Sequence, residues 1–162
     1  MWLSIRKSPE GRIFVNGNDI KECVDSYRLA TSYLPQNVTE TLHGALTLDE
    51  EIDLFCKIHT GESAGNEAAE ILERLGLTKR RTERVGAFSG GEKRRVGIAL
   101  SMLRKPKLLL MDEPGAGLEP KSEKDLMEYL KVRSSRGETV LCVTHLLKHV
   151  KSFSRILILS KR

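Results

Sequence analysis

The sequence is poor in cysteine and has no long apolar run. Its three cysteines, Cys23, Cys56 and Cys142, are widely separated and form no CxxC pair. This spacing excludes a zinc knuckle and a disulfide framework and favours reduced thiols. No apolar stretch approaches the ~18 residues that a membrane-spanning helix needs, and the amino-terminal MWLSIRKSPEGR lacks the apolar core of a signal peptide. Any role at a membrane would therefore need a partner that spans the bilayer.

The sequence also lacks a GxxxxGK[ST] loop, the usual means of binding the phosphates of a nucleotide. The nearest approximation, Gly86 to Lys93, carries Glu92 at the lysine position and Lys93 at the Ser/Thr position. The lysine and hydroxyl that bind the β- and γ-phosphates and Mg²⁺ are therefore absent from it. We expect no nucleotide to be held by this chain through such a loop.

What the sequence does contain is the balance of a globular domain. Hydrophobic residues make up 40% and charged residues 30% of the 162 residues, which is the size of one ordinary domain. The net charge of +5 suits an acidic partner such as a nucleotide phosphate, nucleic acid or an anionic membrane surface. A solvated surface of mixed charge is an equal alternative for any single basic cluster.

Hydrophobic patterns predict alternating strands and helices. We expect strands over residues 12–16, 33–36, 108–114, 139–145 and 155–160, and helices over 47–59, 67–75, 89–104 and 123–133. The apolar runs at 108–111 and 139–143 are typical of strands buried on both faces. Alternation of strand and helix from residue 108 onward indicates a parallel α/β sheet.

Local signals mark the start of the first expected helix and the end of the second. Thr47 precedes Glu50 by three residues, as in a capping box, and Leu48, Ile52, Phe55 and Ile58 then form one apolar face. Gly76 is expected to end the following helix.

The stretch FSGGEKRR opens a third helix. Ser89 can cap it, and Gly90 and Gly91 allow backbone N–H groups to approach an anion at the helix N-terminus. An ordinary Ser-Gly-Gly turn is the alternative for this stretch taken alone.

Ionisable side chains follow two of the expected buried strands. Asp112 and Glu113 end the strand LLLMD, where Asp112 could bind Mg²⁺ and Glu113 could polarise an attacking water. His145 ends TVLCVTH and could hydrogen-bond a phosphate oxygen. Strand C-termini line the ligand crevice of a parallel sheet, so these groups are expected to meet there. His145 and His149 lack the glutamate of an HExxH zinc site.

The order of these motifs resembles the ATP-binding-cassette (ABC) ATPase family. The resemblance rests on YLPQ, then FSGGEKRRVGIALSMLRKPKLLLMDEPGAGLEP, then TVLCVTH, and extends from about Gly11 to the end of the chain. The segments ALTLDEEIDLF and GEKRRVGIA are most similar in sequence to those of exporter-type cassettes. The positions that match the family's motifs are the Q-loop glutamine Gln36, the signature-loop residues Ser89, Gly90, Gly91 and Glu92, the Walker B aspartate Asp112, the catalytic base Glu113, the D-loop Gly115 to Glu119, and the switch histidine His145.

The resemblance implies a fold, cofactors and partners. The fold class is α/β, a P-loop NTPase-like three-layer core with a parallel sheet plus an α-helical subdomain. It divides into a strand region to the Q-loop (11–36), a helical subdomain with the signature loop (45–105) and a core from Walker B to the switch histidine (106–162). ATP and Mg²⁺ are the implied cofactors, with Asp112 and Gln36 on the metal. The implied partners are transmembrane transporter domains and a second ABC ATPase subunit, with no nucleic acid and a cytoplasmic location at the inner face of the membrane.

The sequence departs from the family in several places. The Walker A segment and the first strands that accompany it are missing, so we expect an incomplete nucleotide site. Glu92 replaces the commoner signature glutamine and Glu119 the usual D-loop aspartate, each placing a carboxylate near the expected phosphate. With its neighbouring strand absent, RILILS (155–160) is expected to be displaced, while the strands at YLPQ, LLLMD and TVLCVTH still pair.

Three functions remain open from the sequence. The first is an ATP-hydrolysing subunit that couples ATP hydrolysis to transport through membrane partner domains. The second is a non-catalytic binding module that contributes its signature loop to the ATP site of a partner. The third is an inactive fragment.

Overall fold

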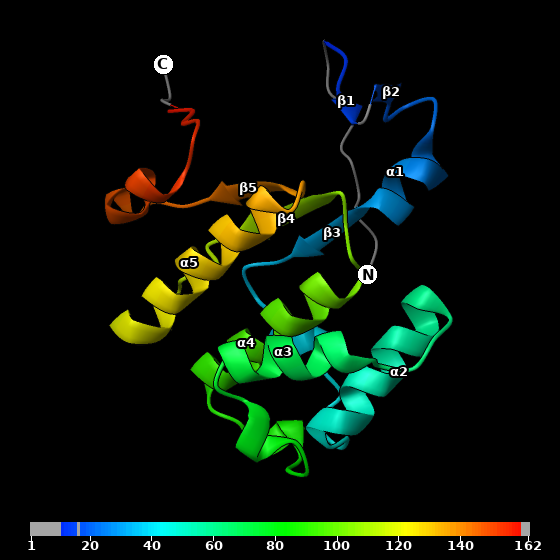
Figure 1. The fold of residues 1–162 in the computed structure, drawn as a ribbon, viewed down its shortest axis with the longest axis vertical. Coiled ribbons are helices and arrows are strands. Elements are labelled where there is room, and N and C mark those ends of the chain that lie inside the picture. Colours follow the sequence, from blue (N-terminus) through cyan, green and yellow to red (C-terminus); the bar gives the residue numbers. More distant parts are fainter. Residues whose placement is uncertain (1–10, 16, 160–162) are drawn as a thin grey trace.

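The centre of the fold is a parallel sheet. The computed structural model describes residues 11–15 and 17–159. Within them, β3 (Thr31–Leu34), β4 (Leu108–Asp112) and β5 (Thr139–Val143) lie side by side in that order, as Figure 1 shows. Both pairs are parallel, with Tyr33 opposite Leu110 and Leu110 opposite Leu141. The expected pairing of the YLPQ, LLLMD and TVLCVTH strands is therefore confirmed.

Helices connect the strands. The described helices are α1 (Val24–Ala30), α2 (Leu48–Thr60), α3 (Asn66–Arg74), α4 (Gly90–Leu103) and α5 (Pro120–Ser135), with short 3₁₀ turns η1 (Thr39–Thr41), η2 (Thr78–Arg80), η3 (Val85–Ala87) and η4 (Leu147–Ser152). Near the amino terminus, β1 (Phe14–Val15) and β2 (Asn18–Asp19) form a small antiparallel hairpin. The strand expected over 12–16 is thus confirmed at Phe14–Val15, and Asn16 lies outside the described residues. None of the described helices is long and apolar enough to cross a bilayer.

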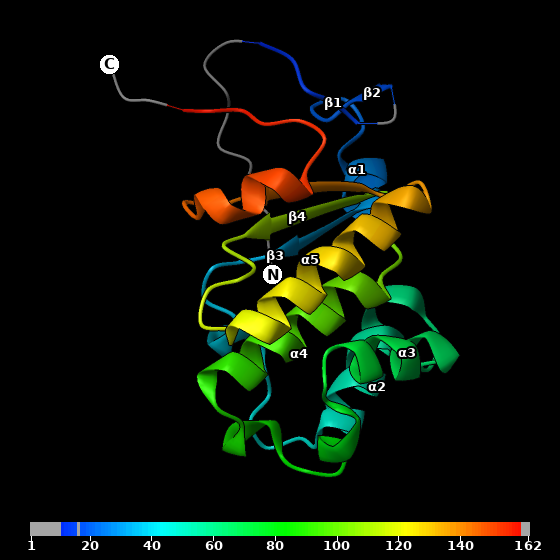
Figure 2. The ribbon, with the colours of Figure 1, turned by 60° about the vertical axis from the view of Figure 1, so that its left-hand side comes forward.

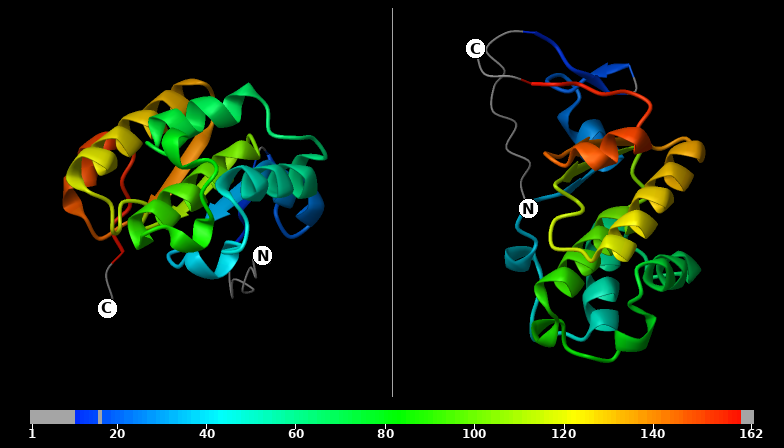
Figure 3. Two further views of the ribbon diagram at one scale, coloured as in Figure 1. Left: turned by 90° about the horizontal axis from the view of Figure 1, so that it is seen from below. Right: turned by 90° about the vertical axis from the view of Figure 1, so that its left-hand side faces the viewer.

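One face of the sheet is covered by α4 and α5 (Figure 2). On that face Leu109 and Met111 of β4 are almost fully buried against apolar residues of both helices. Figures 2 and 3 show α2 and α3 beyond α4, on the side away from the sheet. Gly97 of α4 allows a close approach to the end of β3 and the segment after it, because a Cβ at this position would lie 2.8 Å from Val38 Cγ1 and 3.3 Å from Leu34 Cδ1. The apolar core therefore runs from the sheet through α4 into the α2–α3 layer.

The opposite face of the sheet is open among the described residues. Leu141 and Val143 of β5 are 56% and 62% exposed, although TVLCVTH was expected to be buried on both faces. Leu108 and Leu110 of β4 are half-buried on the same side. The expectation of full burial is wrong because no described helix packs on this face. Of the three layers of the core that the resemblance implies, the described residues form the sheet and the layer of α4 and α5 on one of its faces, with α2 and α3 packed beyond α4.

The segment RILILS forms no strand over its described residues, 155–159. Leu157 and Ile158 are 83% and 86% exposed. The strand expected here is wrong, whereas the expected displacement of this segment is confirmed. An apolar run becomes a strand only when a neighbouring edge accepts its backbone hydrogen bonds.

The predicted caps of two helices are confirmed. Thr47 and Glu50 form a reciprocal capping box at the start of α2. Gly76, in the left-handed region with φ of 66°, follows the end of α3. Ile58, however, is 66% exposed, and Cys56 is buried in its place, so that part of the predicted apolar face is wrong. Leu48, Ile52 and Cys56, at four-residue spacing, face the core.

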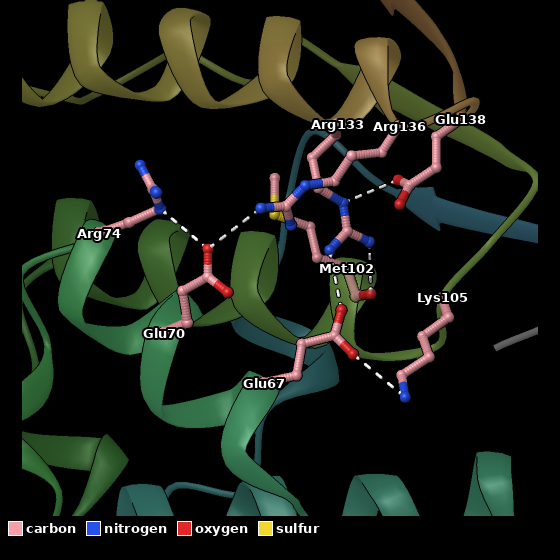
Figure 4. Close-up of polar contacts among 8 residues, drawn as sticks. All are labelled: Glu67, Glu70, Arg74, Met102, Lys105, Arg133, Arg136 and Glu138. Carbon is pink, nitrogen blue, oxygen red and sulfur yellow. Dashed lines mark hydrogen bonds and ion pairs between the residues drawn. The ribbon is translucent and has the colours of Figure 1, made fainter.

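A buried arginine ties the helices to one another (Figure 4). Arg133 of α5 is 2% exposed and donates to Glu138 Oε2 at 2.8 Å, Glu67 Oε1 of α3 at 3.0 Å and the Met102 carbonyl of α4 at 3.1 Å. Lys105 adds a second cation 3.3 Å from Glu67 Oε2. Burial lowers the pKa of Arg133, but its two carboxylate partners raise it by more, so the guanidinium stays charged. The α2–α3 layer is therefore fixed to the sheet layer by charge as well as by apolar packing.

Candidate functional site

The candidate site lies at the carboxyl edge of the sheet. Leu34 is in register with Met111, and Asp112 with Val143, so the three parallel strands end at the same edge. Gln36, the Asp112–Glu113 pair and His145 each follow one of these ends. Glu113 and His145, which were expected near each other at the ends of β4 and β5, are in direct contact at this edge.

Glu113 is held by the segment that follows β5. Its Oε1 accepts hydrogen bonds from the His145 amide at 2.8 Å and pairs with His145 Nδ1 at 2.6 Å, and its Oε2 accepts the Thr144 hydroxyl at 3.0 Å. The backbone of Glu113 is in the left-handed region with φ of 48°, and its amide donates to the Val143 carbonyl at 2.8 Å. This turn directs the carboxylate away from the strand and toward the β5 segment.

The surroundings keep Glu113 ionised. Burial raises the pKa of Glu113, but hydrogen bonds from the His145 ring, the His145 amide and the Thr144 hydroxyl outweigh burial, and its pKa lies below the ordinary value. The side chain of Glu113 is 11% exposed, whereas that of His145 is 76% exposed. The glutamate is thus a buried carboxylate with an accessible imidazole above it.

Asp112 and Gln36 have uncommitted side chains. Asp112 is half-buried and Gln36 is exposed. Neither side chain forms a hydrogen bond or ion pair with another described residue, and Arg94 contacts only their backbone carbonyls. A carboxylate and an amide oxygen are suitable ligands for Mg²⁺. In the described part of the chain, no cluster of three or more His, Cys, Asp or Glu residues forms a metal site by itself.

Arg94 connects the two loops that carry these residues. Its guanidinium donates to the carbonyls of Pro35 at 2.5 Å and Gln36 at 2.7 Å, and to those of Asp112 and of Glu113, the latter at 2.7 Å. Arg94 is 4% exposed. Burial lowers the pKa of Arg94, opposed by the nearby Asp112 and Glu113 carboxylates, and an arginine side chain remains charged. One buried cation therefore joins α4 to the ends of β3 and β4.

This role of Arg94 was not predicted from the sequence. Its guanidinium is occupied by backbone oxygens and is not part of a basic surface. The helical spacing could have predicted its burial, because Arg94 lies three residues before Gly97 and four before the buried Ile98. These positions share the face of α4 that packs on the sheet.

The turn before α4 has the predicted cap. Ser89 Oγ accepts from the Glu92 amide at 3.3 Å, and Glu92 Oε2 accepts from the Ser89 amide at 2.8 Å. Glu92 Oε1 pairs with Arg80 of η2, whose guanidinium also lies 4.6 Å from the centre of the Phe88 ring. The carboxylate of Glu92 is therefore used inside the turn and balanced by a cation, rather than facing the expected phosphate.

The two glycines of the turn have different surroundings. Gly90 has open space where a Cβ would stand, whereas a Cβ on Gly91 would lie 2.8 Å from the Gly117 carbonyl. The turn thus lies against the 115–119 loop that leads into α5. Glu119 at the end of that loop is exposed and gives α5 no side-chain cap. The first N–H groups of α4 have no partner inside a helix, so an anion can approach those of Gly90 and Gly91.

These residues fit ATP and Mg²⁺ in part. Asp112 and Gln36 offer free oxygens, and Gly90, which is exposed with open space beside it, begins a helix N-terminus. The lysine of a GxxxxGK[ST] loop has no counterpart in the sequence. The side-chain oxygens are therefore suitable for Mg²⁺ and the helix N-terminus for one phosphate group. The lysine that usually binds the β- and γ-phosphates has no equivalent among these residues.

Comparison with known proteins gives consistent matches. The family model described as "ABC transporter" matches residues 2–116. Among curated relatives, the linearmycin resistance ATP-binding protein LnrL of Bacillus subtilis (strain 168) is 34% identical over 87% of this chain and 45% of its own length. ABC transporter G family member 4 of Arabidopsis thaliana is 36% identical over 98% of this chain and 28% of its own length. The chain thus spans less than half the length of either relative.

Solved structures share the fold. The chain matches a structure described as the ATP-binding subunit of an ABC transporter with a TM-score of 0.76 and 26% identity, over 91% of this chain and 62% of that one. It also matches a dimeric ATP-binding cassette in a post-hydrolysis state bound to ADP and Pi, with a TM-score of 0.75 and 23% identity, over 89% and 66% of the two chains. The expected P-loop NTPase-like α/β fold class is thereby confirmed.

Replacing Arg94 by methionine should destabilise the chain. The change leaves buried carbonyls of two loops without a donor, and a loss of about 3 kcal/mol in the free energy of unfolding is expected. Urea denaturation measures it. Lys93→Met, the adjacent change in the same helix turn, should cost less than about 1 kcal/mol. Equal losses in the two variants would contradict the role given to Arg94.

The capping contribution of Glu92 should depend on pH. The hydrogen bond from the Ser89 amide, above all, lowers the pKa of Glu92. Its carboxylate therefore stabilises the fold above the unfolded pKa of about 4.3, and this contribution is lost as pH falls through the lower folded pKa. Glu92→Gln should lower the free energy of unfolding by about 1 kcal/mol at neutral pH. The difference should vanish in strong acid, and Glu62→Gln, on an exposed turn, is the control.

Proposed function

The chain belongs to the ABC transporter family, and from that premise we propose that it acts as an ATP-binding subunit that works on ATP shared with a second cassette. The single observation that carries this proposal is the intact Ser89–Gly91 turn at the N-terminus of α4. Its geometry suits binding of the terminal phosphates of an ATP that a partner anchors.

The signature turn is the half of the site that this chain can complete. Gly90 leaves open space for an anion, and the α4 dipole favours negative charge at that end. Glu92 is turned into the cap and paired with Arg80, so it adds little repulsion toward phosphate. Ser89 and the Gly90 and Gly91 amides would contact the terminal phosphate of the ATP that the partner holds.

The strand-end residues would serve a second ATP site, in which the signature turn is supplied by the partner. Asp112 and Gln36 would hold Mg²⁺, which supplies charge neutralisation on the phosphates when bound. Glu113 would orient and deprotonate a water, and its paired His145 would hold the γ-phosphate side of the site. In the present arrangement His145 and Thr144 occupy the Glu113 carboxylate, so water activation requires these hydrogen bonds to rearrange.

A non-catalytic binding module is the second candidate. It is favoured by one contrast: the signature turn is well formed, whereas the sequence contains no GxxxxGK[ST] loop. In this case the chain would stimulate a partner while turning over no ATP itself. A third candidate, an inactive fragment, would do neither.

A groove supports docking on a membrane partner. It has a volume of about 330 Å³ and lies between the end of β3 and α2. Its lining includes the apolar residues Tyr33, Leu54, Phe55 and Ile58 and the polar residues Glu51 and Arg104. Ile58 is 66% exposed at this groove, and Pro35, next to the Q-loop glutamine, also lines it. A helix from a transmembrane domain would bind here, which would hold the chain at the inner face of a membrane.

Mixing the chain with an intact ABC cassette should raise the ATP turnover of that cassette. The chain alone should show negligible turnover. Ser89→Arg should abolish the stimulation, because the larger cation fills the space beside the glycine turn. Ser134→Arg, at the exposed end of α5, should leave it intact.

Two results would count against this proposal. Robust turnover by the chain alone, abolished by Glu113→Gln, would refute the incomplete site. No stimulation in any cassette mixture would refute the contribution of the signature turn.

A substitution in the groove should weaken binding to a membrane partner. Ile58→Lys should weaken binding to a transmembrane domain of a related ABC transporter in nanodiscs by roughly ten- to a hundredfold, as loss of an apolar anchor does. Glu62→Lys adds the same side chain outside the groove and should change the affinity little. Equal binding by both variants, measured by biolayer interferometry, would move the partner surface elsewhere.

A further inference from the structure

A buried glutamate–histidine pair joins the start of α5 to η4, the segment that follows β5. Glu123, in the first turn of α5, and His149 of η4 have side chains 8% and 5% exposed. His149 Nε2 lies 2.5 Å from Glu123 Oε1. The exposed Lys148 reaches the other oxygen, Oε2, at 2.5 Å. Both oxygens of a buried carboxylate are therefore engaged by the segment that follows β5.

The histidine is committed to this contact. With its proton on Nε2, the ring donates to Glu123 and leaves Nδ1 as an acceptor, and Nδ1 is buried without a partner among the described residues. Nε2 of His149 contacts Glu123 and Nδ1 is buried, so neither ring nitrogen is open to a ligand.

The loop after β4 packs directly on the pair. A Cβ on Gly115 would lie 2.9 Å from Glu123 Oε1 and 3.0 Å from His149 Cε1. Because His149 fixes the Glu123 oxygen, the carboxylate cannot simply move aside. The pair therefore sets where the backbone of the 115–119 loop can lie.

The same pair lies one short turn from the switch histidine. His149 follows His145 by four residues, and the His149 amide donates to the Leu146 carbonyl at 3.0 Å. The Leu146 amide in turn donates to Thr144 Oγ1 at 3.1 Å, and this hydroxyl donates to Glu113. A chain of hydrogen bonds thus runs from the buried pair to the residues that contact the glutamate of the site.

We propose that Glu123 and His149 are positioning residues that fix the 144–149 segment and the 115–119 loop relative to each other. Neither side chain touches the expected nucleotide. Their contact places His145 and Thr144 over Glu113 and, through Gly115, places the loop that carries Glu119. The functional importance of these two segments rests on the proposed function, whereas their mutual positioning does not.

Amide hydrogen exchange on the chain alone tests this inference independently of ATP. In His149→Ala, the amide of His145, which donates to Glu113, and the amide of Ala116, which donates to the Glu113 carbonyl, should exchange about tenfold faster. The amide of Leu110, inside β4, should exchange at an unchanged rate. His149→Gln, whose side-chain amide can donate to Glu123, should restore slow exchange at both sites.

Two further variants keep the test decisive. Lys148→Ala removes an exposed partner of the same carboxylate and should leave both rates unchanged. Gly115→Ala should accelerate the His145 amide from the other side of the pair, and it replaces His149→Ala if that variant fails to fold. The inference is overturned if His145 and Ala116 keep their rates in His149→Ala, or if Leu110 accelerates equally and the effect is global. Failure of the glutamine variant to rescue would also overturn it.

Discussion

One buried guanidinium holds together the two loops from which the site is built. The carbonyls that Arg94 contacts lie where β3 and β4 stop, so the sheet ladder no longer supplies their partners. An arginine can satisfy several such oxygens at once because its guanidinium carries five donors in one plane. Since Arg94 is five residues after Ser89 on α4, the same contact sets the distance from the signature turn to Asp112 and Glu113. The geometry of the site therefore depends on a side chain that touches none of its expected ligands.

The basic character of the chain has a structural origin as well as a functional one. Arg94 and Arg133 are both almost fully buried, one against carbonyls and one against Glu67 and Glu138. Neither cation is available to a phosphate, so the net charge of +5 overstates the basic surface. Removing either arginine would take the charged donor away from oxygens in the interior or at its edge, which is costly. These two buried arginines join layers of the fold, and the anion site proposed at the start of α4 would use backbone N–H groups.

Local rules predicted the parts of the fold that depend on neighbouring residues. The capping box at Thr47 and the cap at Ser89 follow from residues a few positions apart, whereas β3 and β4 end at Leu34 and Asp112, before the predicted ends at 36 and 114. The meeting of Glu113 and His145 follows from parallel strands ending at one edge. The failures depend on packing that a local pattern cannot show: RILILS is apolar but has no strand edge to join, and Leu141 is exposed because nothing described covers its face. The roles of Arg94 and His149 required knowledge of which helix face meets the sheet.

Amide hydrogen exchange in the Arg94→Met variant measures most directly whether this residue holds both loops. The amide of Thr41, which donates to the Val38 carbonyl, reports on the segment after β3, and that of Ala116 reports on the segment after β4. If Arg94 joins the loops, both amides exchange faster together, while the Leu75 amide at the end of α3 keeps its rate. Acceleration of one loop alone, or equal acceleration at Leu75, would contradict this account.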